Sequence, residues 1–223
     1  MQVFYQKNDK VFSMKQKEVL IIVPGAKYLS TRSSIVRSLI LLFYKTTRIL
    51  NPVYTNYAEE WSAKFKKENR EVVWLRWNRG FTIWSRWSAS KMLMREVLEY
   101  KKRGYKIQVV GISLGGDISL RVLDKIEDGY IDKIVLICST NTQKKVKKTK
   151  TKLFNIYSPY DLFVRLATRV IAPISGGIIL EGDSVENVCI ENFSHDKFCS
   201  DDVIEVGKYK GKRITDIVKE FLE

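Results

Sequence analysis

Short apolar runs rich in β-branched residues recur along the chain and predict six strands. They lie at residues 18–23, 71–77, 105–110, 133–138, 153–157 and 185–191. Turn-forming residues follow several of these runs, such as Pro24-Gly25 after the first and Ser158-Pro159 after the fifth. The pattern of β-rich runs closed by turns indicates a sheet that is built from well-separated strands.

Helical periodicity fills most of the gaps between the runs. Residues 88–102, 117–126 and 214–222 each place apolar side chains three or four positions apart, and Gly104 is a plausible end for the first of these helices. Strands that alternate with helices predict a mostly parallel sheet of about six strands with helices on both faces. We therefore expect an α/β fold.

The size and composition fit one globular domain. The chain has 223 residues, of which 45% are hydrophobic and 12% aromatic, enough to bury a core without covalent staples. Its three cysteines, Cys138, Cys189 and Cys199, are too few for a disulfide framework, and no Cys-x-x-Cys pair suggests zinc. The first residues lack a secretory pattern and the longest apolar run, 39–44, is too short to span a membrane. We expect a cytoplasmic protein.

The chain is strongly basic, with a formal net charge of +14. Such a field attracts anions, whether nucleic acid, lipid headgroups or acidic substrates. Part of the charge is concentrated in Lys144, Lys145, Lys147, Lys148, Lys150 and Lys152. This cluster is either a solvated, mobile loop or a contact for an anionic surface such as a membrane. No helix-turn-helix, RNP or zinc-finger pattern accompanies it, so we expect no specific binding of nucleic acid.

The candidate chemistry begins at Gly111-Ile112-Ser113-Leu114-Gly115-Gly116. This G-x-S-x-G pattern stands between a predicted strand and a predicted helix, which is the setting of a nucleophile elbow. In that turn a serine hydroxyl projects from the edge of the sheet, and the flanking glycines leave room for the strand and the helix. A glycine-rich loop without chemistry is the alternative, so the rest of the chain must supply partners for Ser113.

A serine nucleophile needs a base, usually a histidine that a carboxylate orients. The chain has one histidine, His195, which follows the sixth predicted strand. Asp161 follows the fifth and is the preferred carboxylate, because open α/β sheets place their chemistry at the carboxyl ends of strands. Asp117 is a rival that could simply favour a helix N-terminus. Three further acids, Asp196, Asp201 and Asp202, are close to His195 in sequence and are expected on a solvated loop.

An oxyanion hole needs two backbone N–H donors. Leu114, the residue after Ser113, would supply the first. The turn Pro24-Gly25-Ala26 after the first strand would supply the second from Ala26. A plain strand-ending turn is the alternative for Pro24-Gly25.

With these residues in the order Ser, Asp, His, the chain resembles the α/β-hydrolase family from about residue 18 to its end, and small lipases or serine esterases in particular. The resemblance implies a catalytic triad of Ser113, His195 and Asp161, an oxyanion hole from Leu114 and Ala26, and no metal or organic cofactor. Two positions depart from the family pattern. Ile112 stands where many members have histidine, and Pro24 replaces the histidine of the common His-Gly loop. The antiparallel strands that the family has at its N-terminus are expected to be reduced here, to residues 2–5 and 11–12.

These expectations combine into a serine hydrolase that cleaves carboxylic esters of acyl or lipid-like substrates. The alternative is a non-catalytic protein of the same fold that binds an anionic surface through its basic face. Two segments bear on the substrate. Residues 33–50 are expected either to pack on the sheet as a buried helix, or to cap the site, or to rest on a membrane surface. A group of aromatic residues packs in the core or lines an acyl-binding wall; its members are Trp74, Trp77, Phe81, Trp84 and Trp87.

Overall fold

The computed structural model describes residues 16–25, 57–79, 82–171 and 176–223. Six strands form one sheet in the order β2-β1-β3-β4-β5-β6. Their bounds are β1 Glu18–Val23, β2 Arg70–Trp74, β3 Lys106–Ile112, β4 Lys133–Ile137, β5 Lys152–Tyr157 and β6 Val185–Cys189. All five pairings are parallel, so the predicted α/β fold is confirmed and its sheet is wholly rather than mostly parallel.

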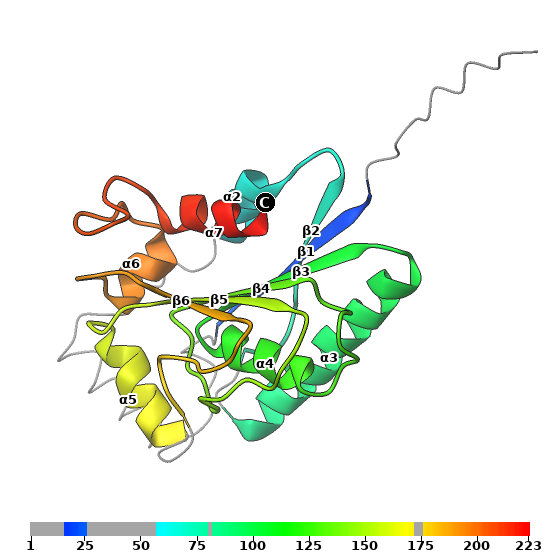
Figure 1. Ribbon diagram of the computed structural model, residues 1–223, viewed down its shortest axis with the longest axis horizontal. Coiled ribbons are helices and arrows are strands. Elements are labelled where there is room, and N and C mark those ends of the chain that lie inside the picture. The colour runs from blue at the N-terminus through cyan, green and yellow to red at the C-terminus, as the bar shows by residue number, and fades with distance from the viewer. Residues whose placement is uncertain (1–15, 26–56, 80–81, 172–175) are drawn as a thin grey trace, which may run out of the picture.

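Helices cover both faces of the sheet (Figure 1). On one side lie α3, Ile83–Lys102, and α4, Leu114–Leu123; on the other lie α2, Tyr57–Phe65, and α7, Ile214–Leu222. Each side has its own core, because successive side chains of a strand point to opposite faces. Val19 and Ile21 of β1 pack with α3 and α4, whereas Leu20 and Ile22 pack with α2 and α7.

The parallel register brings the carboxyl ends of the strands to one edge. Val23 pairs with Gly111, Ile112 with Ile137, and Tyr157 with Cys189. The sheet order reverses beside β1, which has β2 on one side and β3 on the other. Open α/β sheets bind their ligands in the crevice at such a switch point, which here lies between the ends of β1 and β3.

The six predicted strands all exist, with ends that shift by up to three residues. Two helices begin earlier than predicted. The α3 helix begins at Ile83 because the Thr82 side chain accepts the Ser85 N–H and caps it. The α4 helix begins directly after Ser113. Three helices were not predicted: α2, α5, Leu162–Ile171, and α6, His195–Ser200.

The aromatic group divides between core and surface. Trp77 is buried and Trp74 is half-buried, which confirms core packing for these two. Trp84 and Trp87, on the first turns of α3, are 77% and 45% exposed, so the expectation of core packing is wrong for them. Their rings pack edge to face on each other. Phe81 lies outside the described residues, as do residues 33–50 and the reduced N-terminal strands.

The lysine-rich segment between β4 and β5 is held by hydrogen bonds to neighbouring loops. Val146 and Glu181 are joined through the backbone at 2.8 Å, and Lys144 Nζ lies 2.5 Å from a Glu181 carboxylate oxygen. Asp128 accepts hydrogen bonds from the Thr149 hydroxyl at 2.6 Å and the Lys150 N–H at 2.8 Å. Within the described ranges, no helix is both long and apolar enough to cross a bilayer.

Candidate active site

Ser113 occupies a strained turn at the end of β3. β3 ends at Ile112 and α4 begins at Leu114, so Ser113 alone makes the change of direction. Its backbone angles are φ 53° and ψ −121°, a conformation that costs a non-glycine residue about 1–3 kcal/mol. The Ser113 N–H donates to the Ile137 carbonyl at 2.9 Å and ties the turn to β4. This is the geometry expected of a nucleophile elbow.

Three glycines make this turn possible by letting the backbone approach its neighbours closely. A Cβ on Gly111 would lie 2.7 Å from the Cα of Gly116. A Cβ on Gly115 would lie 1.9 Å from the Val23 carbonyl oxygen, and one on Gly116 would lie 1.9 Å from Ser139 Oγ. Any side chain at these positions would collide, so the glycines allow α4 to start against the ends of β1 and β4.

Asp161 and His195 form a buried pair at the same edge of the sheet. The Nδ1 atom of His195 lies 2.9 Å from Oδ2 of Asp161, and both side chains are almost completely buried. The other carboxylate oxygen, Oδ1, accepts the Val164 N–H at 2.9 Å and so holds the first turn of α5. The Phe163 ring packs against the imidazole with 4.6 Å between centroids. Asp161 is therefore fixed by α5 in a position that orients His195.

The electrostatics of the site favour a charged imidazole. Burial by itself lowers the pKa of His195, but electrostatic interactions with Cys199 and Asp161 and the hydrogen bond to Asp161 outweigh it, raising this pKa from 6.5 to about 9. Because the carboxylate stabilises an imidazolium, it also stabilises the protonated base that forms when a serine is deprotonated.

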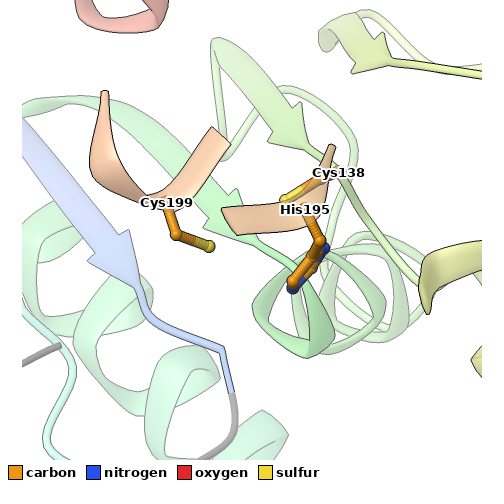
Figure 2. A group of neighbouring side chains, drawn as sticks. All are labelled: Cys138, His195 and Cys199. Carbon is orange, nitrogen blue, oxygen red and sulfur yellow. The ribbon is translucent and has the colours of Figure 1, made fainter. Parts of the chain in front are cut away.

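Cys138 connects His195 to the elbow. It follows directly on Ile137, whose carbonyl accepts the Ser113 N–H. Ligand atoms of Cys138, His195 and Cys199 all lie within 4.8 Å of one another, and Figure 2 shows the three side chains converging. Burial raises the pKa of the Cys138 thiol well above 9, and the Cys199 thiol adds to this through a hydrogen bond. The elbow and the Asp161–His195 pair therefore share a neighbour.

The loop after β1 passes directly against Ser113. A Cβ on Gly25 would lie 2.9 Å from Cβ of Ser113 and 3.5 Å from its Oγ. Side chains from beyond β2 hold this loop: Trp77 Nε1 donates to the Pro24 carbonyl at 3.1 Å, and Arg79 Nε donates to the Gly25 carbonyl at 2.7 Å. Leu114, as the first residue of α4, has an N–H without a carbonyl partner in its own helix. Ala26 lies outside the described residues.

The rival carboxylates have structural roles. Asp117, in the first turn of α4, is buried and forms ion pairs with two arginines. Its Oδ2 atom lies 3.0 Å from Arg86 Nη1 and 2.8 Å from Arg121 Nε. It also accepts hydrogen bonds from the backbone and hydroxyl of Thr142. The expectation of a solvated loop is wrong for Asp201, which is buried and accepts the Thr215 hydroxyl at 2.7 Å. Asp196 lies in α6, while Asp202 is exposed as expected.

Sequence reasoning missed the two cysteines as neighbours of His195. One signal was present, because His195 and Cys199 are four residues apart, a spacing that puts two side chains on one face of a helix. This spacing is informative only in a helix, and the local pattern around His195 predicts a turn. Nothing in the sequence connected Cys138 to this pair, because only the parallel pairing of the strands brings the end of β4 beside α6.

Comparisons with known proteins give a likeness in fold alone. No protein-family model matches the chain, and no curated protein matches it. Among solved structures, a Pectobacterium atrosepticum protein described as a YdeN-like hydrolase is 10% identical, with a TM-score of 0.46 over 80% of each chain.

Two further solved structures resemble this chain with similarly low identity and TM-score. A cutinase-like protein from a Cryptococcus species is 13% identical, with a TM-score of 0.41 over 78% of this chain and 75% of that one. A Trichoderma reesei cutinase is 10% identical, with a TM-score of 0.42 over 70% of each chain. All three have hydrolase-like names, and the functional inference below depends on the residues of this chain.

Proposed function

We propose that the protein is a serine hydrolase that cleaves carboxylic esters, with Ser113 as nucleophile, His195 as base and Asp161 as the carboxylate that orients it. The observation that carries this proposal is the buried 2.9 Å contact between Asp161 and His195 at the sheet edge where Ser113 sits in a strained turn. A serine in a strained turn and an imidazole oriented by a carboxylate, both at the carboxyl edge of the sheet, are the groups that acyl transfer requires.

In this mechanism His195 accepts the hydroxyl proton as Ser113 Oγ attacks the acyl carbonyl. The imidazolium, stabilised by Asp161, then gives that proton to the leaving alcohol as the C–O bond breaks and an acyl-enzyme remains. A water molecule, deprotonated by the same imidazole, attacks the acyl-enzyme and releases the acid. The Leu114 N–H and a donor from the loop that begins at Gly25 would stabilise the oxyanion in both steps.

Acyl esters with an apolar acyl chain fit this site better than peptides. The exposed Trp84 and Trp87 at the start of α3 and the exposed Leu162 at the start of α5 follow the carboxyl ends of β2 and β5, at the site's own edge of the sheet. Apolar side chains placed there favour a substrate with an apolar part.

A serine-reactive fluorophosphonate tests the assignment. We expect it to label the wild type, to leave Ser113→Ala unlabelled, and to label His195→Ala at least about a hundredfold more slowly, because the base is gone. Ser88→Ala, at an exposed serine of α3, is the matched control and should react like the wild type. A folded wild type that takes up no label would contradict the proposal and would favour a non-catalytic protein of this fold.

Gly25→Ala tests whether the loop after β1 lies against Ser113 as the structure places it. The new methyl group would lie 2.9 Å from Ser113 Cβ and 3.2 Å from the Ile112 carbonyl oxygen, so the loop or the nucleophile must move. We expect labelling to slow by at least about tenfold, since small displacements of reacting groups are costly. Thermal unfolding shows whether the variant is folded, and wild-type labelling by a folded Gly25→Ala would be evidence against this placement of the loop.

A further inference from the structure

Two cysteines and the proposed catalytic histidine form a compact buried cluster. Cys138 lies just beyond β4, whereas His195 and Cys199 lie in α6 (Figure 2). One ligand atom from each residue falls within 4.8 Å of the other two, and all three residues are buried. The mechanism above uses only the imidazole and leaves the two thiols without a role.

Two thiols and an imidazole are a ligand set that suits a soft or borderline metal ion. Thiolates favour Zn²⁺ and Cu⁺, and imidazole also suits Zn²⁺. A tetrahedral zinc ion with such ligands needs donor atoms about 3.5–3.8 Å apart, as follows from bond lengths of about 2.0–2.3 Å. The observed upper limit of 4.8 Å therefore requires the donor atoms to approach one another by at most about 1.3 Å.

The surroundings prepare His195 as a ligand. Its Nδ1 is held 2.9 Å from the Asp161 carboxylate, which leaves Nε2 as the ring nitrogen available to bind a metal ion. Metal-bound histidines commonly have their other nitrogen on a carboxylate in this way. Cys199 follows four residues later in α6, the spacing at which two side chains of one helix share a metal ion. Three protein ligands leave the fourth position of a tetrahedral ion for water.

We propose that Cys138, His195 and Cys199 bind one zinc-like metal ion and that the bound ion inhibits the hydrolase. The inhibitory part rests on the proposed function, because a metal ion on the imidazole nitrogen prevents that nitrogen from accepting the Ser113 proton. The binding part stands on the cluster alone.

Metal binding is measured directly, on the full chain kept reduced and freed of metal. We expect one equivalent of Zn²⁺ by competition with a chromogenic chelator, and a thiolate-to-metal charge-transfer absorption when Co²⁺ replaces it. Cys138→Ala and Cys199→Ala should each weaken binding at least about tenfold, the lower end of what loss of even a supporting group costs. Cys189→Ala, at the exposed cysteine of β6, is the matched control and should bind like the wild type.

Inhibition is measured by fluorophosphonate labelling of Ser113 in the same samples. Saturating Zn²⁺ should suppress labelling of the wild type and of Cys189→Ala, and a chelator should restore it. Folded Cys199→Ala should need at least about tenfold more Zn²⁺ than the wild type for the same degree of suppression.

Absence of binding to the reduced, folded wild type, or binding by both cluster variants that is as tight as that of the wild type, would overturn the metal site. Labelling that is unchanged or increased at metal saturation would overturn the inhibition. A wild type that is never labelled, with or without metal, would instead count against the proposed function. The binding measurements test the metal site independently of that result.

Discussion

At the scale of single residues, the sequence singled out Ser113, Asp161 and His195, and the structure explains how two of them meet. Asp161 uses one carboxylate oxygen to hold the first turn of α5 and the other to hold His195. A residue with both tasks is rigidly placed. Neither hydrogen bond is visible in the sequence, since His195 lies 34 residues from Asp161 and Val164 belongs to a helix that periodicity did not predict.

The pKa of His195 is the most direct prediction at this scale. We expect its imidazole NMR signals, unambiguous because it is the one histidine of the chain, to titrate near pH 9 in metal-free protein. The fluorophosphonate reaction should speed up over the same range, because only the neutral imidazole accepts a proton. Cys199→Ala should lower this pKa, since it removes an electrostatic interaction that raises it. A wild-type midpoint at or below 6.5 would contradict the electrostatic argument.

The raised pKa of His195 also predicts how the stability of the folded protein changes with pH. The folded-state pKa of His195 lies above its ordinary value of 6.5, so the folded protein holds this proton more tightly than the unfolded chain does. The resulting stabilisation is complete below pH 6.5 and is lost as the pH rises towards and through 9. At about 1.4 kcal/mol per pKa unit it amounts to roughly 3 kcal/mol, which urea unfolding at pH 6 and pH 10 would detect against His195→Ala.

At the scale of elements, periodicity was sufficient for the strands and insufficient for the short helices. Strands with continuous apolar runs were found because both faces of a parallel sheet are buried. The α6 helix has only six residues, too few to show a period, and its helical state depends on tertiary packing rather than propensity. The start of α4 at Leu114 likewise depends on contacts that the Gly115 and Gly116 backbones make with other strands.

The α4 helix is also anchored by a buried charge. Asp117 binds Arg86 of α3, and both side chains are almost fully buried. Replacing Asp117 with Asn leaves a buried guanidinium without its counter-charge, so we expect a loss of about 3–5 kcal/mol in the free energy of unfolding.

Asp124→Asn, at the exposed C-terminal cap of the same helix, is the control and should change stability by less than about 0.5 kcal/mol. Equal urea midpoints for both variants would show that the Asp117–Arg86 pair does not stabilise the packing of α3 on α4.

At the scale of the whole molecule, the dominant property is the net charge of +14. Like charges repel one another across the folded protein, and the repulsion is greatest when few counter-ions screen it. We expect the melting temperature to rise when NaCl is increased from about 0.02 M to about 0.2 M, where the screening length falls below about 10 Å. Sodium sulfate at equal ionic strength distinguishes screening from specific anion binding. A melting temperature that falls with added NaCl would contradict this account.

The sequence by itself determined the class of the fold, the six strands and the turn at Ser113, because local patterns of apolar and turn-forming residues specify them. Only the tertiary structure decided which carboxylate pairs with His195, that Gly25 lies against Ser113, and that Cys138 and Cys199 lie beside the imidazole. The physical reason is the same in each case. Parallel pairing aligns the carboxyl ends of strands that are far apart in the chain, and no local pattern records which side chains then become neighbours.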